Sequence, residues 1–161
     1  NRAKRPIIAF TNYKEIHGQK PDKKDSAMVK IKRMMLLPLC NSYLRGSKLG
    51  KWLFQCLGNP ITHPTVTYVL KEMPKECFRK GYQAAMDWDL WQRLSKQKGE
   101  FVYVKDIVFY HRIHKEQATA ILVEETSERR KEEYEIFCRF WSSFLVKLIM
   151  KFYSRAEKFY E

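Results

Sequence analysis

The sequence predicts an α/β fold, in which strands alternate with helices that pack on a mixed sheet. Apolar runs rich in β-branched and aromatic residues occur at residues 6–10, 65–70 and 100–104. Between them lie segments whose apolar side chains recur every three or four positions, which is the spacing of one face of a helix. Such alternation is typical of domains in which helices cover a sheet. A long amphipathic helix is predicted to follow at the carboxyl end.

The first part of the chain is predicted to contribute one strand and two helices. Residues 6–10 are expected to form a short buried strand. Ser26 is a residue type that caps helices, and the helix expected after it runs to Leu37, where Pro38 stops it. A shorter helix is expected over residues 48–56, ahead of a turn at residues 58–60.

The rest of the predicted sheet surrounds one helix. Over residues 87–98 the apolar side chains Leu90, Trp91 and Leu94 share a face, and Gly99 is placed to end the helix. Strands are predicted on either side of it, at residues 65–70, 100–104 and 107–110. The expected order is therefore strand, helix, strand, helix, strand.

Residues 121–161 are predicted to form an amphipathic helical tail, with the helix itself at about 127–159. Its apolar residues recur at spacings of three and four and form one stripe: Phe137, Phe140, Trp141, Phe144, Leu145, Leu148, Ile149 and Phe152. Basic residues are interleaved with this stripe at Arg139, Lys147, Lys151 and Arg155, a pattern typical of a helix lying on an anionic membrane surface. Packing of the stripe against protein is the alternative.

Composition limits the partners. The chain has 31 Lys and Arg against 18 Asp and Glu, a formal charge of +13, which favours a polyanion such as nucleic acid, an anionic membrane or a phosphorylated substrate. The basic residues are dispersed and carry no nucleic-acid-binding signature, so nucleic acid is the less favoured of these. The 4 cysteines form no C-x-x-C pair, which indicates neither a zinc site nor a disulfide scaffold and is expected of a reducing compartment.

Asp87-Trp88-Asp89 places two carboxylates at the start of the helix predicted over residues 87–98. Asp87 stands where an N-cap accepts amide hydrogens, and Asp89 lies near the positive end of the helix dipole. Two hard oxygen donors at this spacing could instead bind a divalent ion that carries a diphosphate. A third hypothesis is general base catalysis, in which one carboxylate takes a proton from a hydroxyl. The residue types alone leave all three open.

Four segments occur in an order that resembles the carboxyl-terminal half of a family-2 glycosyltransferase, whose GT-A fold has a Rossmann-like sheet. The segments are Asn59-Pro60-Ile61 with Pro64-Thr65-Val66, then Asp87-Trp88-Asp89-Leu90-Trp91-Gln92-Arg93-Leu94, then Gly99-Glu100-Phe101, then His111-Arg112-Ile113-His114 with Gln117-Ala118-Thr119. The resemblance implies that residues 1–120 form the acceptor-side half of such a domain. The family has a glutamate before its key aspartate, whereas this chain has Met86.

The resemblance also implies roles for individual residues. Asp87 is the expected general base of an inverting transfer, in which a sugar moves from a nucleotide-diphosphate sugar to an acceptor hydroxyl. Asp89, Trp88 and Trp91 are expected at the acceptor, although Asp89 could be a cap and Trp91 a core residue. Arg112 and His114 are expected to contact the donor diphosphate or to close a loop over it; a surface arginine and a histidine bonded to backbone are the alternative.

Cofactors and partners follow from the same resemblance. In the family, the nucleotide-binding half and the metal-binding D-x-D precede the strand that corresponds to residues 6–10, so we expect no metal at Asp87-Trp88-Asp89. Mg²⁺ or Mn²⁺ is expected only in the complete enzyme, and this segment alone is expected to be inactive. The acceptor would belong to surface polysaccharide or lipid-linked glycan synthesis, at the cytoplasmic side of the membrane, with peripheral contact through residues 127–159. A basic nucleic-acid-binding module and a non-catalytic docking module are the alternatives.

Overall fold

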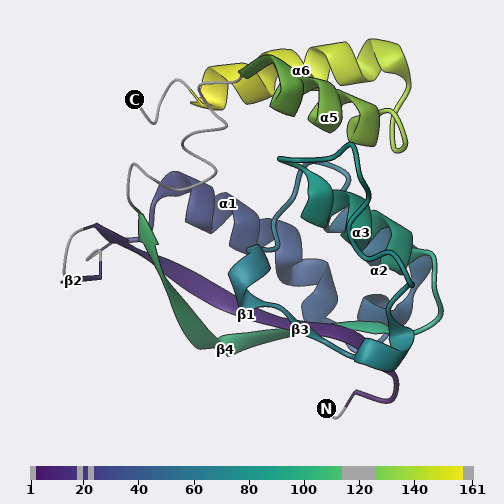
Figure 1. Cartoon of the computed structure of the whole chain (residues 1–161). Helices are drawn as coiled ribbons and strands as arrows, with labels where there is room; N and C mark the ends of the chain where they lie inside the picture. Colours follow the sequence, from purple (N-terminus) through teal and green to yellow (C-terminus); the bar gives the residue numbers. More distant parts are fainter. Residues whose placement is uncertain (1–2, 18–19, 22–23, 114–125, 158–161) are drawn as a thin grey trace.

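The structure is a computed structural model of the chain and describes residues 3–17, 20–21, 24–113 and 126–157 (Figure 1). Its centre is the strand β1 (Pro6–His17), along which β4 (Glu100–Ile113) pairs in parallel. Two short strands, β3 (Thr67–Tyr68) and β2 (Lys20–Pro21), pair antiparallel with opposite ends of β1. The predicted α/β fold with a mixed sheet is therefore confirmed.

The strand lengths differ from the prediction because pairing decides them. β1 continues well past Phe10, since β4 offers partners as far as His17. The strand predicted at 65–70 shrinks to β3, which pairs only with Ile8 and Ala9 and has 3-10 turns on both sides. The two pieces predicted at 100–104 and 107–110 form the single strand β4. The gap between them is an irregularity in its register with β1, between the Thr11 and Asn12 pairs.

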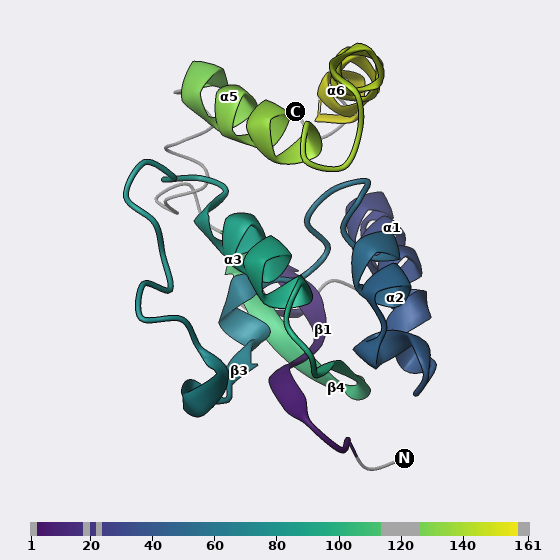
Figure 2. The ribbon, with the colours of Figure 1, turned by 90° about the vertical axis from the view of Figure 1, so that its right-hand side faces the viewer.

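Three helices cover one face of this sheet (Figures 1 and 2). α1 (Ala27–Leu36) begins at the predicted cap, where the Ser26 hydroxyl accepts the Val29 amide over 3.3 Å. It ends in a 3-10 turn that contains Pro38. α2 (Lys48–Leu53) is shorter than predicted, and α3 (Met86–Ser95) carries Asp87 and Asp89. The core between helices and sheet includes Ile8, Phe10, Phe54, Leu90, Trp91, Leu94 and Phe101.

The single long tail helix was a wrong prediction. Two helices, α5 (Thr126–Phe137) and α6 (Ser143–Glu157), fold back on each other and lie on the side of α1 and α3 that faces away from the sheet (Figures 1 and 2). The chain turns between them at residues 138–142.

Tertiary contacts explain this break. The amides of Arg139 and Phe140 bond to carbonyls three residues back, which tightens the end of α5 into a 3-10 turn. The indole N–H of Trp141 donates to the Cys56 carbonyl over 2.7 Å, and its ring meets Trp52 edge-on. Because Trp141 is bound to the α2 region, the chain leaves the helical path, and the Ser142 carbonyl accepts the first bond of α6.

The break divides the predicted stripe. Phe137, Phe140, Trp141 and Ile149 join the cluster around Trp88, whereas Phe144, Leu145 and Leu148 are exposed on α6. The Phe152 side chain lies outside the described residues. Among the helices of the described part, none combines the length and apolar character needed to cross a bilayer.

Candidate functional site

Asp87 lies inside the first turn of α3 and is not its N-cap, so the capping prediction was wrong. The N-cap is Ala85, and Asp87 is the second residue of the helix. Its Oδ1 accepts the amide of Trp88 over 2.7 Å, and its Oδ2 accepts the side-chain amide of Asn59 over 2.9 Å. One oxygen is thus held by the helix and the other by the turn before β3.

A carboxylate from α5 bonds the amides that precede α3, which is why Asp87 is not needed there. Glu132 accepts hydrogen bonds from the amides of Gln83, Ala84 and Ala85 at 2.8, 2.9 and 2.8 Å. Its side chain is buried. No local pattern around residue 132 could have predicted this bond, because its partners lie 47 to 49 positions away.

The surroundings of Asp87 favour a protonatable carboxyl. Burial raises the pKa of Asp87 above its ordinary value, while the bonds from Asn59 and Trp88 and the charges of His63 and Lys32 oppose the rise. A carboxylate with a raised pKa holds a transferred proton better than an ordinary one. The pKa of Asp87 is therefore shifted in the direction that general base catalysis uses.

Lys32 on α1 lies over Tyr13 of β1 and its charge acts on Asp87, and the sequence did not predict it. Its ammonium lies 5.5 Å from the centroid of the Tyr13 ring. Burial lowers the pKa of Lys32, while the charges of Asp87 and Glu15 raise it. The only sequence signal is a lysine within the amphipathic run of α1, which does not distinguish it from its neighbours.

An aromatic wall adjoins Asp87. The Tyr68 ring stacks on Trp91 at 6.0 Å between centroids, and His63 meets both rings edge-on. Burial, followed by the charge of Asp87, raises the pKa of Tyr68 to about 12, so its hydroxyl keeps its proton. The buried Tyr68 hydroxyl and Asn59 Oδ1 have no hydrogen-bond partner in the described chain. The site thus offers polar groups whose bonds a polar ligand or water would complete.

The carboxylate of Asp89 contacts different residues than the carboxylate of Asp87 does. Its carboxylate is completely buried and receives the guanidinium of Arg93 at 2.8 Å and that of Arg139 at 2.7 Å, with Arg79 at 3.8 Å. Burial by itself would raise the pKa of Asp89, but the bonds from Arg139 and Arg93 bring it below the ordinary value. Asp89 is therefore an ion-paired carboxylate, and its expected role at the acceptor stays a prediction.

The two tryptophans of α3 are buried in different hydrophobic clusters. Trp88 packs against Phe137 of α5, with ring centroids 4.9 Å apart. Trp91 faces Tyr68 in the core between α3 and the sheet. Neither indole N–H has a hydrogen-bond partner in the described part of the chain. The core position of Trp91 matches the alternative stated for it, and the acceptor-binding role of both stays a prediction.

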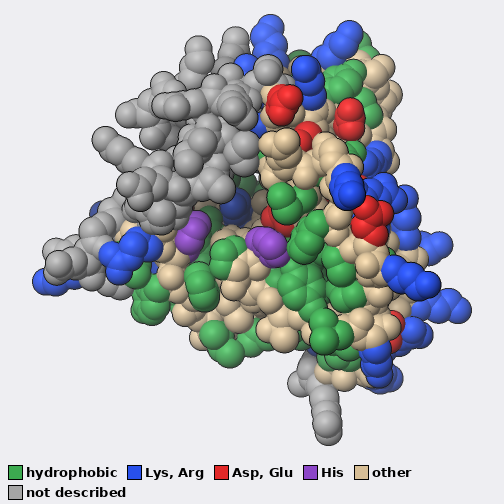
Figure 3. Space-filling model, in the orientation of Figure 1, with side chains coloured by type: hydrophobic (Ala, Val, Ile, Leu, Met, Phe, Trp, Pro, Cys, Tyr) green, Lys and Arg blue, Asp and Glu red, His purple; other side chains and the backbone are tan. Residues whose placement is uncertain are grey.

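The second predicted group is only partly described. Arg112 lies exposed on β4 opposite Ile16, while His114 and the segment 117–119 lie outside the described residues. The neighbouring His111 contacts Tyr13 edge-on at 6.2 Å, and the Lys32 ammonium lies over the same Tyr13 ring. Figure 3 shows histidine, acidic and basic side chains together on this face, close to the part drawn in grey.

Neither the arrangement of possible metal ligands nor comparison with known proteins assigns a function to this site. Within the described residues, no group of three or more His, Cys, Asp or Glu side chains is arranged to hold a metal ion. Searches against protein-family models, curated proteins and solved structures found no significant match to this chain.

Proposed function

We propose that this chain is the acceptor-side half of an inverting glycosyltransferase of the hexosyltransferase type, with a GT-A-like fold and Asp87 as its general base. The observation that carries the proposal is the environment of Asp87. Its carboxyl has a raised pKa, is held by Asn59 and lies beside aromatic rings and unpartnered polar atoms. Aromatic faces commonly pack against sugar rings, and unpartnered polar atoms suit sugar hydroxyls.

The chemistry at Asp87 would be a single displacement. The acceptor hydroxyl is a weak nucleophile near neutral pH, so its proton moves to the Asp87 carboxylate as its oxygen bonds to the anomeric carbon. The bond from that carbon to the diphosphate breaks on the opposite face, and its electron pair leaves with the diphosphate. The configuration at the anomeric carbon is therefore inverted.

Other residues of α3 would support this step in different ways. Trp91, together with Tyr68, would form the wall of the acceptor pocket. Asp89 and Trp88 are bound to α5 and the turn after it, so their contribution would be to hold the helix that carries Asp87. Arg112 and His114 are proposed to contact the donor diphosphate. A nucleotide-binding half would hold the donor and its Mg²⁺ or Mn²⁺, at the cytoplasmic side of the membrane.

The experiment that tests this proposal uses the chain joined to a nucleotide-binding half. We expect Asp87→Asn to lower turnover, measured as release of nucleoside diphosphate, by about a hundredfold or more without lowering the melting temperature. Asp106→Asn is the matched control, because Asp106 is exposed on β4. Near-normal turnover of Asp87→Asn would remove Asp87 from the mechanism. Calorimetry on the 161-residue chain alone should show no micromolar binding of uridine or guanosine diphosphate sugars.

A further inference from the structure

α6 presents an exposed apolar strip that the rest of the described chain leaves uncovered. Phe144 is 77%, Leu148 49% and Leu145 41% exposed. On the other side of the same helix, Val146, Ile149 and Met150 pack in the cluster with α5. A helix advances about 100° per residue, so these two sets occupy opposite faces. Uncovered apolar groups clustered on one helix face are typical of an interaction surface.

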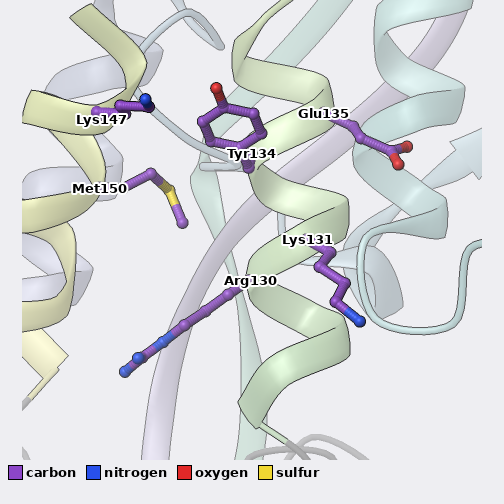
Figure 4. Close-up of a pocket in the computed structure, with 6 residues that line it drawn as sticks. All are labelled: Arg130, Lys131, Tyr134, Glu135, Lys147 and Met150. Carbon is purple, nitrogen blue, oxygen red and sulfur yellow. The ribbon is translucent and has the colours of Figure 1, made fainter. Parts of the chain in front are cut away.

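Cations border this strip. Lys147 and Lys151 are exposed on α6, at helical positions next to Phe144 and Leu148. Lys147 also borders a shallow cleft of about 630 Å³ between α5 and α6, which is lined by Arg130, Lys131, Tyr134, Glu135, Lys147 and Met150. Figure 4 shows Lys147 and Met150 reaching from α6 toward Tyr134 on α5. Its lining thus combines three cations and one carboxylate with the side chains of Tyr134 and Met150.

The chemistry of this surface selects among partners. A second copy of the chain, which also has a formal charge of +13, would bring two net-basic surfaces together, which is unfavourable. A nucleic acid would be attracted by the cations but would not cover the leucines and Phe144 with apolar groups. An anionic lipid bilayer suits both the cations and the apolar strip. Its phosphates pair with the cations, and its acyl chains surround the apolar residues.

We propose that α6 lies flat on an anionic phospholipid surface, with Phe144, Leu145 and Leu148 inserted among the acyl chains. Lys147 and Lys151 contact the headgroups, and the α5–α6 cleft receives a lipid phosphate beside Lys147. At about 1.5 Å per residue, the contact from Phe144 to Lys151 is roughly 10 Å long. Only a helix lying in the plane of the surface uses one exposed face along its length. The proposal does not depend on glycosyl transfer by Asp87.

The test is co-sedimentation of the 161-residue chain with vesicles of phosphatidylcholine, with and without phosphatidylglycerol. The double variants Phe144→Ser/Leu148→Ser and Lys147→Glu/Lys151→Glu should each lower the partition coefficient on anionic vesicles by about tenfold or more. Matched controls make comparable changes at exposed residues elsewhere: Leu49→Ser/Leu70→Ser and Lys48→Glu/Lys71→Glu. The partition coefficients of the control variants should be close to that of the unchanged chain. Circular dichroism should show that every variant is folded.

The competing partners give separate results. Binding to anionic vesicles that is weak, or equal for α6 variants and controls, would overturn the proposal. A concentration-dependent dimer that Phe144→Ser/Leu148→Ser abolishes, without vesicle binding, would assign the strip to a second copy. Retention on duplex DNA that Lys147→Glu/Lys151→Glu abolishes, without vesicle binding, would assign it to nucleic acid. The two proposals can be told apart. If the α6 variants lose vesicle binding but the chain joined to a nucleotide-binding half transfers no sugar, the membrane proposal is supported and the enzymatic proposal is refuted.

Discussion

Arg139, in the turn after α5, donates to the fully buried carboxylate of Asp89 on α3 over 2.7 Å. The same guanidinium nitrogen also reaches the side-chain oxygen of Gln92 at 2.6 Å. Two residues that are 50 positions apart in the sequence are therefore joined by a charged hydrogen bond. This bond attaches the helical tail to the helix that carries Asp87.

Asp89→Asn is expected to destabilise the protein strongly. Replacing the carboxylate leaves the guanidinium groups of Arg93 and Arg139 without their anion in a partly buried place, which typically costs about 3–5 kcal/mol. Urea unfolding measures this loss. Arg79→Ala is the control, because Arg79 is 3.8 Å from Asp89 and its side chain is 49% exposed, so it should cost about 1 kcal/mol or less. Equal losses in the two variants would show that Asp89 contributes no more than a surface pair.

Glu132→Gln is expected to loosen the segment before α3. The substitution removes the charge that three backbone amides share, and bonds to charged groups contribute about 1.5–3 kcal/mol. Amide hydrogen exchange should become faster at Gln83, Ala84 and Ala85, and urea unfolding should show the loss. Glu135→Gln serves as the control, because Glu135 is exposed and accepts a hydrogen bond from the Tyr82 hydroxyl. Unchanged exchange at residues 83–85 would contradict the role given to Glu132.

Asp87→Asn is expected to change how stability depends on pH. The folded protein raises the pKa of Asp87, so the folded state binds its proton more tightly than the unfolded state. The contribution of Asp87 to stability therefore falls as pH rises from its unfolded pKa of about 3.9 through its higher folded pKa. Asp87→Asn should remove this decline and be at least as stable as the unchanged protein at pH 7.

Unfolding by urea at a series of pH values measures this effect. Asp89 serves as a control in which stability should change with pH in the opposite direction, because the folded protein lowers its pKa. Its contribution is present above the unfolded pKa and is lost on acidification through the lower folded pKa. A clear loss of stability in Asp87→Asn at pH 7 would mean that its carboxylate serves the fold instead.

Gly99→Ala should be more destabilising than Gly81→Ala. Both glycines have positive φ, at 138° and 106°, so alanine is strained at either position. At Gly99 the new Cβ would also lie 2.7 Å from Ile7 Cγ1 and 3.0 Å from the Arg5 carbonyl oxygen, whereas nothing lies within 4 Å at Gly81. Thermal unfolding should show about 1–2 kcal/mol for Gly81→Ala and a larger loss for Gly99→Ala. A smaller loss at Gly99 would show that β1 yields easily there.

Local chemistry made part of the fold predictable. Ser26 and Pro38 bound α1 because capping and the missing proline amide act within one turn of the chain. α3 and the start of β4 followed from the spacing of apolar residues and from Gly99. For the site, the sequence singled out Asp87, but its raised pKa arises from burial by other segments, against the opposing effects of Asn59 and Lys32.

What could not be predicted depends on contacts between distant segments. The length of β1 is decided by pairing with β4, and the break between α5 and α6 by the bond of Trp141 to Cys56. A continuous apolar periodicity does not reveal such a bond. The bond from the Ala85 amide to Glu132, at the start of α3, could not be predicted either. The residues around Ala85 and around Glu132 carry no pattern that indicates this pairing.

The parallel pairing of β1 with β4 also bears on how the chain folds. The amide of Lys4, just before β1, bonds to the carboxylate of Glu100 at the start of β4, 96 positions along the chain. Closing so long a loop must precede the pairing that stabilises it, and folding rates decrease as contacts become less local. We expect α1 to gain structure early, from its own cap, and the sheet to form only in the rate-limiting step. Mutations in the β1–β4 pair should then slow refolding, whereas changes in the α5–α6 hairpin should mainly speed unfolding.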